Sequence, residues 1–241
     1  MTEGLQERVE AVRSRIAAAC GRAGRDSQSV SLVAVSKGVG PEDIRAASDC
    51  GLAVFGESRI QEAAVKIPLC PGGLEWHLVG HLQRNKVGPA VGLFGLIHSV
   101  DSERLLQAIN DACGESGRVM PVFLEVNVSA ESGKFGMPPQ ELAGVVERST
   151  SLMNVEIRGL MTMPPFRPDP EDARPFFRRL RELRDEARAA TGFDLPDLSM
   201  GMSGDLEVAI EEGATRVRIG TAVFGERRQK AWRPEEVTSD E

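Results

Sequence analysis

The chain alternates between short apolar segments and longer helix-like segments, and the alternation continues along most of its length. The apolar segments are rich in valine, leucine and isoleucine, which is typical of strands buried on both faces of a parallel sheet. They span residues 30–36, 51–56, 74–80, 95–100, 119–128, 155–163, 197–202 and 215–220. Eight strands, each followed by a helix or a helical turn, favour an α/β fold with a single (β/α)8 barrel of the TIM type.

The length of the chain, 241 residues, matches the usual size of such a barrel. An open, doubly wound sheet is the alternative, but it would need fewer strand–helix units or a second domain. No low-complexity linker interrupts the alternation. We therefore expect residues 1–228 to form one barrel domain and residues 229–241, which are polar and contain proline, to form a loose tail.

The N-terminal segment is charged and amphipathic. Its apolar residues recur at helical spacing, so we expect an extra helix before the first strand, with one buried face. That face is formed by Leu5, Val9, Val12 and Ile16. The segment lacks the continuous apolar core of a signal peptide, and no apolar run in the chain approaches the roughly 18 residues that span a bilayer.

Charge and cysteine usage exclude several classes of function. The formal net charge of -7 argues against nonspecific nucleic-acid binding, which needs a basic surface. The cysteines, Cys20, Cys50, Cys70 and Cys113, lack CxxC spacing and predict neither a zinc site nor a disulfide framework. A cytoplasmic protein that binds neither nucleic acid nor membrane is the expectation.

Lys37 follows the first apolar run directly, where the predicted strand leaves the core. The C-terminal ends of barrel strands form the mouth at which small molecules bind. Partial burial at this place would lower the pKa of the lysine and make its amine a nucleophile toward aldehydes. Lys37 is therefore a candidate for a Schiff base. The alternative is a solvated lysine that opens a loop.

Two glycine-containing turns follow the seventh and eighth predicted strands. In the first, Gly201 lets the backbone approach a ligand, Ser203 offers a hydroxyl, and Ser203 or Asp205 can cap the following helix. In the second, Gly220 and Thr221 supply further donors. Loops at these positions commonly hold a phosphate in barrels, although an ordinary turn is the alternative for each. An amine and a phosphate cradle at one mouth predict pyridoxal 5'-phosphate (PLP).

Arginine and histidine residues also lie in or near the predicted strand ends. Arg216 and Arg218 share one face of the eighth strand, and the alternation alone leaves open whether that face is inward or outward. His77, in the polar segment at the end of the third strand, is expected to be a satisfied core residue, and His98 is expected to be structural. The three histidines lack metal-ligand spacing.

These segments resemble the pyridoxal phosphate homeostasis protein family, also called the proline synthetase co-transcribed homologue. The segments that carry the resemblance, in the order of the family, are residues 34–37, 55–62, 77–86, 126–131 with Lys134, 159–163, 198–203 and 217–221 with 224–225. The resemblance implies a barrel like the N-terminal domain of alanine racemase, without the C-terminal β domain of that enzyme. It also implies PLP as cofactor, held as an internal aldimine on Lys37.

The implied cofactor-binding residues are Lys37, Ser58, Met202, Ser203, Arg218, Gly220 and Thr221. The resemblance implies that the phosphate is held by Ser203, the nearby backbone and Gly220–Thr221. It also implies that Arg218 lies near the pyridine nitrogen, where a cation keeps that nitrogen unprotonated, so Arg218 should face into the site. Lys134 matches a second family lysine near the site.

The chain departs from the family pattern in two places. Ser58 stands where the family usually has asparagine, so a contact to the ring or its O3' is lost or bridged by water. Gly-Val-Gly follows Lys37 where the family often has Thr-Lys-Pro, which changes the shape of the first loop.

The function that the resemblance implies is intracellular PLP homeostasis. The protein would hold PLP and deliver it to apoenzymes as a monomer, without strong catalysis. The alternative is a weak PLP-dependent amino-acid racemase. Racemases of this class use a lysine and a tyrosine as two bases, and this chain contains no tyrosine, so the second base would be His81, a cysteine or a residue of another subunit. A barrel that binds another phosphate, without PLP, is a third reading.

Overall fold

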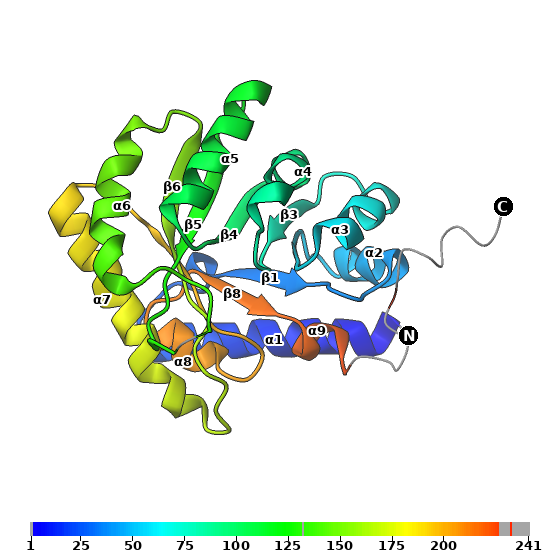
Figure 1. Ribbon diagram of the computed structural model, residues 1–241. Helices are drawn as coiled ribbons and strands as arrows, with labels where there is room; N and C mark the ends of the chain where they lie inside the picture. The colour runs from blue at the N-terminus through cyan, green and yellow to red at the C-terminus, as the bar shows by residue number, and fades with distance from the viewer. Residues whose placement is uncertain (1, 132, 227–231, 233–241) are drawn as a thin grey trace.

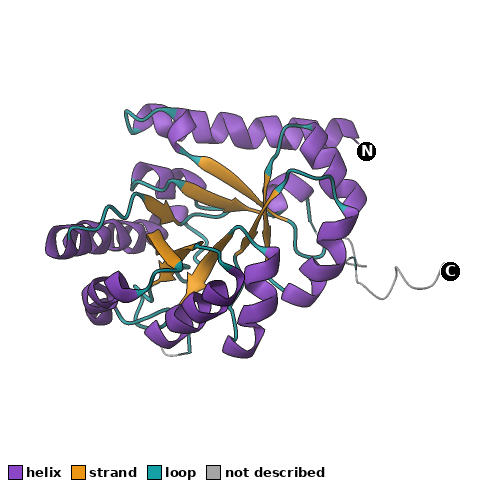
Figure 2. Ribbon diagram, turned by 90° about the horizontal axis from the view of Figure 1, so that it is seen from above, coloured by secondary structure: helices purple, strands orange, loops and turns teal. Residues whose placement is uncertain are grey.

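The computed structural model describes residues 2–131, 133–226 and 232. Parallel strands pair in sequence order and close into a barrel, because β8 returns to pair with β1. Figure 1 and Figure 2 show these strands in the middle of the molecule with helices around them. The strands are β1 (Ser31–Val35), β2 (Val54–Glu57), β3 (Glu75–Leu78), β4 (Leu96–Val100), β5 (Met120–Glu125), β6 (Val155–Met161), β7 (Asp197–Ser199) and β8 (Arg216–Ile219). The predicted barrel is confirmed.

The helices form the outer layer. They are α1 (Thr2–Arg22), α2 (Pro41–Asp49), α3 (Ile60–Lys66), α4 (Val87–Leu93), α5 (Glu103–Ser116), α6 (Leu142–Arg148), α7 (Arg174–Thr191), α8 (Leu206–Glu211) and α9 (Thr221–Phe224). α1 precedes the first strand and packs against α8 and α9, as Figure 1 shows. Its predicted apolar face is buried, so the extra N-terminal helix is confirmed.

Helix α5 illustrates how local sequence sets the bounds of a helix. Ser102 is its N-cap, and its hydroxyl accepts a hydrogen bond from the N–H of Leu105. Gly117 ends the helix in the left-handed conformation with φ of 64°, which glycine adopts at little cost. Leu106 and Ile109 are buried against the barrel, as their spacing predicts.

Each of the eight strands is shorter than the sequence predicts, and two of them show the reason most clearly. The seventh was expected over residues 197–202 but ends at Ser199, because the backbone turns at Gly201 with φ of 92°. The fifth was expected over residues 119–128 but ends at Glu125. Beyond that point the N–H of Asn127 bonds to the carbonyl of Met137 in the following loop, not to β6. Both shortenings place loop backbone at the mouth of the barrel.

Gly159 is required by the close approach of β6 and β7. A Cβ at this position would lie 1.9 Å from the carbonyl oxygen of Asp197. Only glycine allows the two strands to pair at this distance.

Most of the predicted tail, residues 229–241, lies outside the described residues, and the boundary at 228 stays a prediction. Trp232 is described, and its N–H donates to the carbonyl of Gly38 at 3.0 Å. Within the part of the chain that the structure describes, no helix has the length and apolar character needed to cross a membrane.

Candidate functional site

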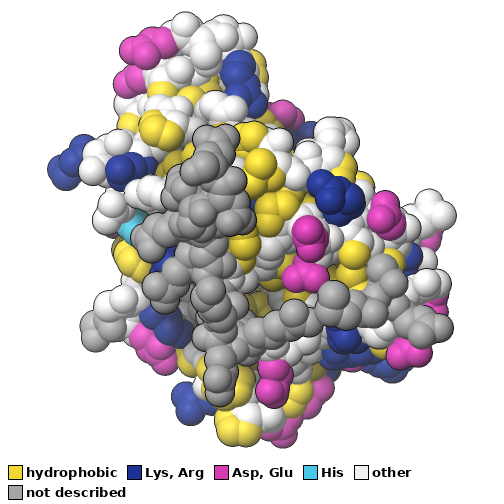
Figure 3. Space-filling model, turned by 90° about the vertical axis from the view of Figure 1, so that its right-hand side faces the viewer, with side chains coloured by type: hydrophobic (Ala, Val, Ile, Leu, Met, Phe, Trp, Pro, Cys, Tyr) yellow, Lys and Arg dark blue, Asp and Glu magenta, His cyan; other side chains and the backbone are white. Residues whose placement is uncertain are grey.

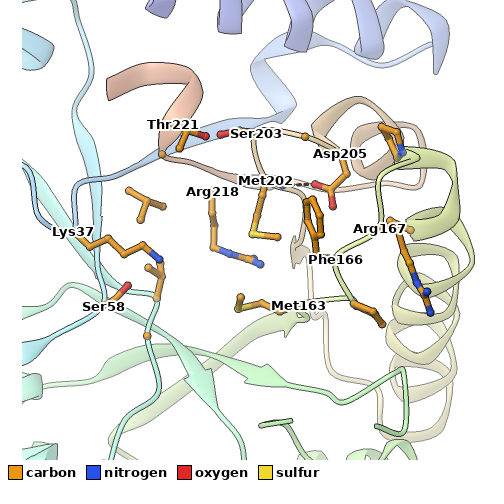
Figure 4. Close-up of a pocket in the computed structure, with 18 of the residues that line it drawn as sticks. Lys37, Ser58, Met163, Phe166, Arg167, Met202, Ser203, Asp205, Arg218 and Thr221 are labelled. Atoms are coloured by element: carbon orange, nitrogen blue, oxygen red, sulfur yellow. Dashed lines mark hydrogen bonds between the residues drawn. The ribbon is translucent and has the colours of Figure 1, made fainter. Parts of the chain in front are cut away.

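A cavity of about 720 Å³ lies at the C-terminal ends of the strands. Figure 3 looks toward the end of the barrel to which β1 and β8 point, where hydrophobic side chains show between charged ones. The cavity brings together every site residue that the sequence predicts: Lys37, Ser58, Met202, Ser203, Arg218, Gly220 and Thr221. They come from the ends of β1, β2, β7 and β8, as Figure 4 shows.

Lys37 stands in the turn after β1, and its side chain points into the cavity (Figure 4). The residue is exposed, whereas partial burial was expected. The difference arises because β1 ends at Val35, and the side chain of Lys37 extends from the turn into the open mouth, not into the packed core. An exposed amine at this position can be reached by a ligand that enters the cavity.

The backbone on both sides of Lys37 is held by a buried cluster of charged residues. Lys66 is fully buried, and its Nζ donates to the carbonyl of Ser36 at 2.9 Å. The same Nζ donates to Glu57 Oε1 at 2.8 Å and to Glu62 Oε1 at 2.5 Å. Glu62 Oε1 in turn accepts the N–H of Gly38 at 2.6 Å. Lys66 and Glu62 therefore fix the two residues that flank Lys37 in the sequence.

Glu57 is the most desolvated carboxylate of this cluster. Burial raises its pKa, while the Lys66 ammonium and the hydrogen bonds from Lys66 and Ser36 oppose the rise. The hydroxyl of Ser36 donates to Glu57 Oε1 at 2.7 Å. Its other oxygen, Oε2, is buried without a hydrogen-bond partner among the described residues. The cluster therefore couples the end of β1 to β2 and α3 through charge.

The turns after β7 and β8 meet on the other side of the cavity. Ser203 Oγ accepts the N–H of Ala222 at 3.2 Å, which leaves the hydroxyl hydrogen of Ser203 to donate to a ligand. Figure 4 shows the side chains of Ser203 and Thr221 close together. Hydroxyl groups from two loops thus converge at one place, which suits an anion.

The expectation that Asp205 or Ser203 caps the next helix through its side chain is wrong. Asp205 occupies the N-cap position of α8 but makes no side-chain bond to the helix. Its carboxylate instead accepts the N–H of Met202 at 2.6 Å, as the dashed line in Figure 4 marks, and Ser203 bonds to the start of α9. The side chains close the β7 turn and join it to the β8 turn.

Arg218 settles the question of which way the eighth strand faces. Its side chain lies inside the barrel, is 4% exposed and lines the cavity. Nη1 donates to Ser199 Oγ at 2.7 Å, and Nη2 donates to the carbonyl of Thr162 at 2.9 Å. Burial lowers the pKa of Arg218 to about 10, although the negative charges of Glu125 and Asp205 oppose this. The group is a cation held in a fixed orientation.

Glu125 is a cavity residue that the sequence analysis missed. It ends β5, is buried, and has a pKa raised to about 7 by desolvation, against the opposing charge of Arg218. A carboxylate at the end of an apolar strand was the available signal. The loop after β6 adds Met163, Phe166 and Arg167 to the cavity wall (Figure 4), and no local pattern pointed to them.

Ser58 and His81 lie on the lysine side of the cavity. Ser58 sits against Gly80, where a Cβ would come within 2.3 Å of the Ser58 carbonyl oxygen. The ring of His81 stacks on Phe135 at a centroid distance of 3.8 Å, and its Nδ1 lies 3.3 Å from a carboxylate oxygen of Asp101. Of the second bases considered for a racemase within this chain, His81 lines the cavity and the cysteines do not.

Lys134, the second lysine singled out by the resemblance, does not line the cavity. Its Nζ lies 2.9 Å from a carboxylate oxygen of Glu131 in the loop after β5. His77 and His98, expected as core residues, are both buried. The described residues contain no group of three or more His, Cys, Asp or Glu side chains arranged to hold a metal ion.

The barrel fold and the cavity at its C-terminal end place this protein in a known class. Residues 8–228 match the family "Alanine racemase, N-terminal domain". The chain resembles the structure of alanine racemase from Clostridium difficile 630 with a TM-score of 0.76 at 12% identity, covering 96% of this chain and 59% of that one. At this identity the likeness shows the fold alone, a barrel of the alanine racemase type.

Closer relatives narrow the class to one family. The chain is 49% identical over 223 residues to the pyridoxal phosphate homeostasis protein of Aquifex aeolicus, covering 92% of this chain and 98% of the relative. It is 41% identical to the protein of that name from Pseudomonas aeruginosa, covering 92% and 96%. The structure of PipY from Synechococcus elongatus PCC7942 with PLP bound matches with a TM-score of 0.81 at 36% identity, covering 92% and 100%. This chain belongs to the pyridoxal phosphate homeostasis protein family.

Proposed function

We propose that this chain binds PLP in the cavity at the barrel mouth and acts in intracellular PLP homeostasis. The observation that carries the proposal is the convergence of a lysine amine, two hydroxyl donors and a buried arginine on one cavity. The names of the relatives agree with this function.

The residues at the mouth fit the chemistry of PLP. The ligand needs an amine for its aldehyde, donors for its phosphate and a neighbour for its ring nitrogen. Lys37 offers the amine, Ser203 and Thr221 offer hydroxyl donors, and Arg218 offers N–H groups in a desolvated place. A cavity of about 720 Å³ falls in the range of small-molecule sites.

In this proposal Lys37 is the Schiff-base residue. When bound, PLP supplies an electrophilic aldehyde and an electron-withdrawing ring. Lys37 would supply the amine that holds this aldehyde, and the turn that carries Lys37 is kept in place by Lys66 and Glu62. Because Lys37 is exposed, a ligand held there would stay accessible to water and to competing amines, which suits a reversible carrier.

The other residues hold the remaining parts of the ligand. Ser203, Thr221 and the backbone of Met202 and Gly220 would bind the phosphate. Arg218 would keep the ring nitrogen unprotonated, because a fixed cation disfavours a second positive charge beside it. Ser58 stands where the family usually has asparagine, and because its hydroxyl reaches less far, the contact to the ring or its O3' would be lost or bridged by water.

The test compares PLP with pyridoxine 5'-phosphate, which carries the phosphate and ring but no aldehyde. Lys37→Ala should abolish the absorbance of the covalent adduct and weaken PLP binding, while the affinity for pyridoxine 5'-phosphate stays within about twofold. Lys134→Ala, outside the cavity, is the matched control and should change neither. An unchanged adduct band in Lys37→Ala would overturn the assignment of Lys37.

A second variant tests the phosphate assignment. Ser203→Ala removes one hydroxyl donor and should weaken both ligands by a similar factor of about ten, the worth of one hydrogen bond to a charged group. The adduct absorbance should remain at saturating PLP. Unchanged affinity for both ligands would contradict the role of Ser203.

Delivery of PLP to apoenzymes, a monomeric state and a cytoplasmic location are further parts of the proposal. The exposure of Lys37 supports transfer, and the four free thiols support a reducing compartment. Transfer is tested by mixing the PLP-loaded protein with an apoenzyme and an excess of a PLP-trapping amine. Activation of the apoenzyme no faster than with free PLP and the same trapping amine would argue against direct delivery. Sedimentation measures whether the protein is a monomer.

A further inference from the structure

A chain of hydrogen bonds runs through the barrel from the cavity to its opposite end. Arg218 Nη1 lies 2.7 Å from Ser199 Oγ, and Ser199 Oγ lies 2.8 Å from His98 Nδ1. His98 Nε2 lies 3.0 Å from His77 Nδ1, and His77 Nε2 lies 2.7 Å from Glu75 Oε1. Glu75 begins β3 and its side chain is 57% exposed, so the chain ends at solvent on the N-terminal face.

The three middle members are buried in the core. Ser199 and His98 have no exposed surface, and His77 is 2% exposed. His98 also packs edge-on against Phe123, at a ring centroid distance of 4.7 Å. Buried polar groups of this kind must satisfy one another, because water cannot reach them.

The chemistry of the two ends fixes the direction of every bond. Arginine has only donors, so Arg218 donates to Ser199, and the single hydrogen of Ser199 is left for His98 Nδ1. A neutral His98 then carries its hydrogen on Nε2 and donates it to His77 Nδ1. His77 likewise carries its hydrogen on Nε2 and donates it to the Glu75 carboxylate. Each donor and each acceptor along this path is used once.

The opposite direction does not work. Arg218 cannot accept, so Ser199 would receive two N–H groups and its own hydrogen would point to neither partner. The exposed Glu75 would also have to be protonated in order to donate to His77. The first direction is therefore the one that satisfies all five side chains.

We propose that Ser199, His98 and His77 are positioning residues that hold the Arg218 guanidinium in one orientation, as a one-way hydrogen-bond chain anchored at Glu75. This positioning role rests on the proposed function, in which Arg218 lies beside the ring nitrogen of PLP. The hydrogen-bond chain itself is present in the protein without PLP.

The charges around this hydrogen-bond chain agree with a neutral His98 in its middle. Burial, and then the nearby His77, Arg218 and Arg216, hold the pKa of His98 well below its usual range. The hydrogen bond from His77 lowers the pKa of Glu75, with further lowering by Arg216 and an opposing effect of burial. On the remaining sides the charged groups are Glu125 and Asp205 beside Arg218, and Asp197, whose Oδ2 lies 3.7 Å from Arg216 Nη2.

The test reads histidine tautomers directly in the PLP-free protein. The protein has three histidines, so two-bond ¹H–¹⁵N spectra of histidine-labelled protein are assigned with the variants His81→Gln and His77→Gln. His77 and His98 should both appear neutral with the hydrogen on Nε2 at pH 7, and His98 should stay so at pH 5. A hydrogen on His98 Nδ1, or a doubly protonated His98, would overturn the proposal whether or not PLP binds.

Ser199→Ala then links the chain to the ligand. It should shift the ring nitrogens of His98, move the absorbance maximum of bound PLP and weaken PLP binding about tenfold, the worth of one hydrogen bond to a charged group. Ser149→Ala, which removes a buried hydroxyl bonded to the Val146 carbonyl outside the site, is the matched control and should change none of these.

Normal PLP binding and an unmoved absorbance maximum in Ser199→Ala would contradict the positioning role. A failure of the unsubstituted protein to bind PLP would refute the proposed function. The tautomer spectrum would still decide whether the hydrogen-bond chain from Arg218 to Glu75 exists.

Discussion

The lysine side and the arginine side of the cavity hold their cations by opposite means. On the lysine side the turn is held by buried charges, Lys66 with Glu57 and Glu62, while the side chain of Lys37 extends into the open mouth. On the arginine side the guanidinium itself is buried and bonds to uncharged acceptors on Ser199 and Thr162. In the proposed function Lys37 forms a reversible covalent bond, which needs an accessible amine on a firm base, whereas Arg218 sets the charge beside the ring, which needs one orientation.

Removing Lys66, the buried cation that holds the turn on the lysine side, should have the largest effect. Lys66→Met leaves two carboxylates without their buried partner and should lower the free energy of unfolding by about 3–5 kcal/mol. Urea unfolding measures this loss. Lys86→Met, on the partly exposed turn after β3, is the matched control and should cost less than about 1 kcal/mol.

A triple variant sharpens this result. Adding Glu57→Gln and Glu62→Gln to Lys66→Met removes the unpaired charges and should restore part of the lost stability. If Lys66→Met alone costs less than about 1 kcal/mol, the cluster does not hold the turn by charge.

Glu125→Gln should change how stability depends on pH. Burial raises the pKa of Glu125 from 4.5 to about 7, so the folded state binds a proton that the unfolded state has released. The stability from this group is complete below pH 4.5 and is lost as the pH rises toward 7. The variant should therefore be more stable than the parent by about 2–3 kcal/mol at pH 8, and equal to it at pH 4.

Thermal unfolding at a series of pH values measures this difference. Glu125 is a carboxylate of the arginine side that has no ion-pair partner within the described ranges, in contrast to Glu57. A variant that is less stable than the parent at pH 8 would show that the ionised carboxylate stabilises Arg218.

Ser199→Ala tests how the arginine side is held. The change leaves a buried N–H of Arg218 and the Nδ1 of His98 without a partner, and should lower the free energy of unfolding by about 1–3 kcal/mol. Urea unfolding beside Lys66→Met ranks the two sides directly. A larger loss for Ser199→Ala than for Lys66→Met would reverse the comparison.

The smallest effect is expected for Trp232→Ala. The Trp232 ring lies 5.2 Å from Lys66 Nζ, and its loss should cost about 0.5–1 kcal/mol. The backbone bond from Trp232 to Gly38 remains in the variant. A loss close to that of Lys66→Met would mean that the ring, more than the carboxylates, neutralises the buried ammonium.

Much of the fold followed from local pattern, because strands buried on both faces leave continuous apolar runs. The same logic placed Lys37 and Ser203 at the mouth, since parallel strands end together. Period-two alternation could not choose the face of Arg218, because it gives the same spacing inward and outward. The geometry decided it through Ser199, a residue from another strand.

The buried charges could not be predicted in the same way. Glu62 and Lys66 are spaced as an ordinary exposed helix pair, and their burial depends on the turn after β1, which lies about 30 positions earlier in the chain. The chain from Glu75 to Arg218 joins four strands, so no window of sequence contains it. Glu125 was overlooked because the fifth strand was predicted to run to residue 128, which placed this carboxylate inside the strand and not at its end.

The most direct test of the account is borohydride reduction of the PLP-treated protein, followed by mass mapping of the labelled peptide. The account predicts one reduced adduct, on Lys37. An adduct on Lys134 or Lys86, or no adduct at saturating PLP, would contradict the assignment of Lys37 as the residue that holds PLP.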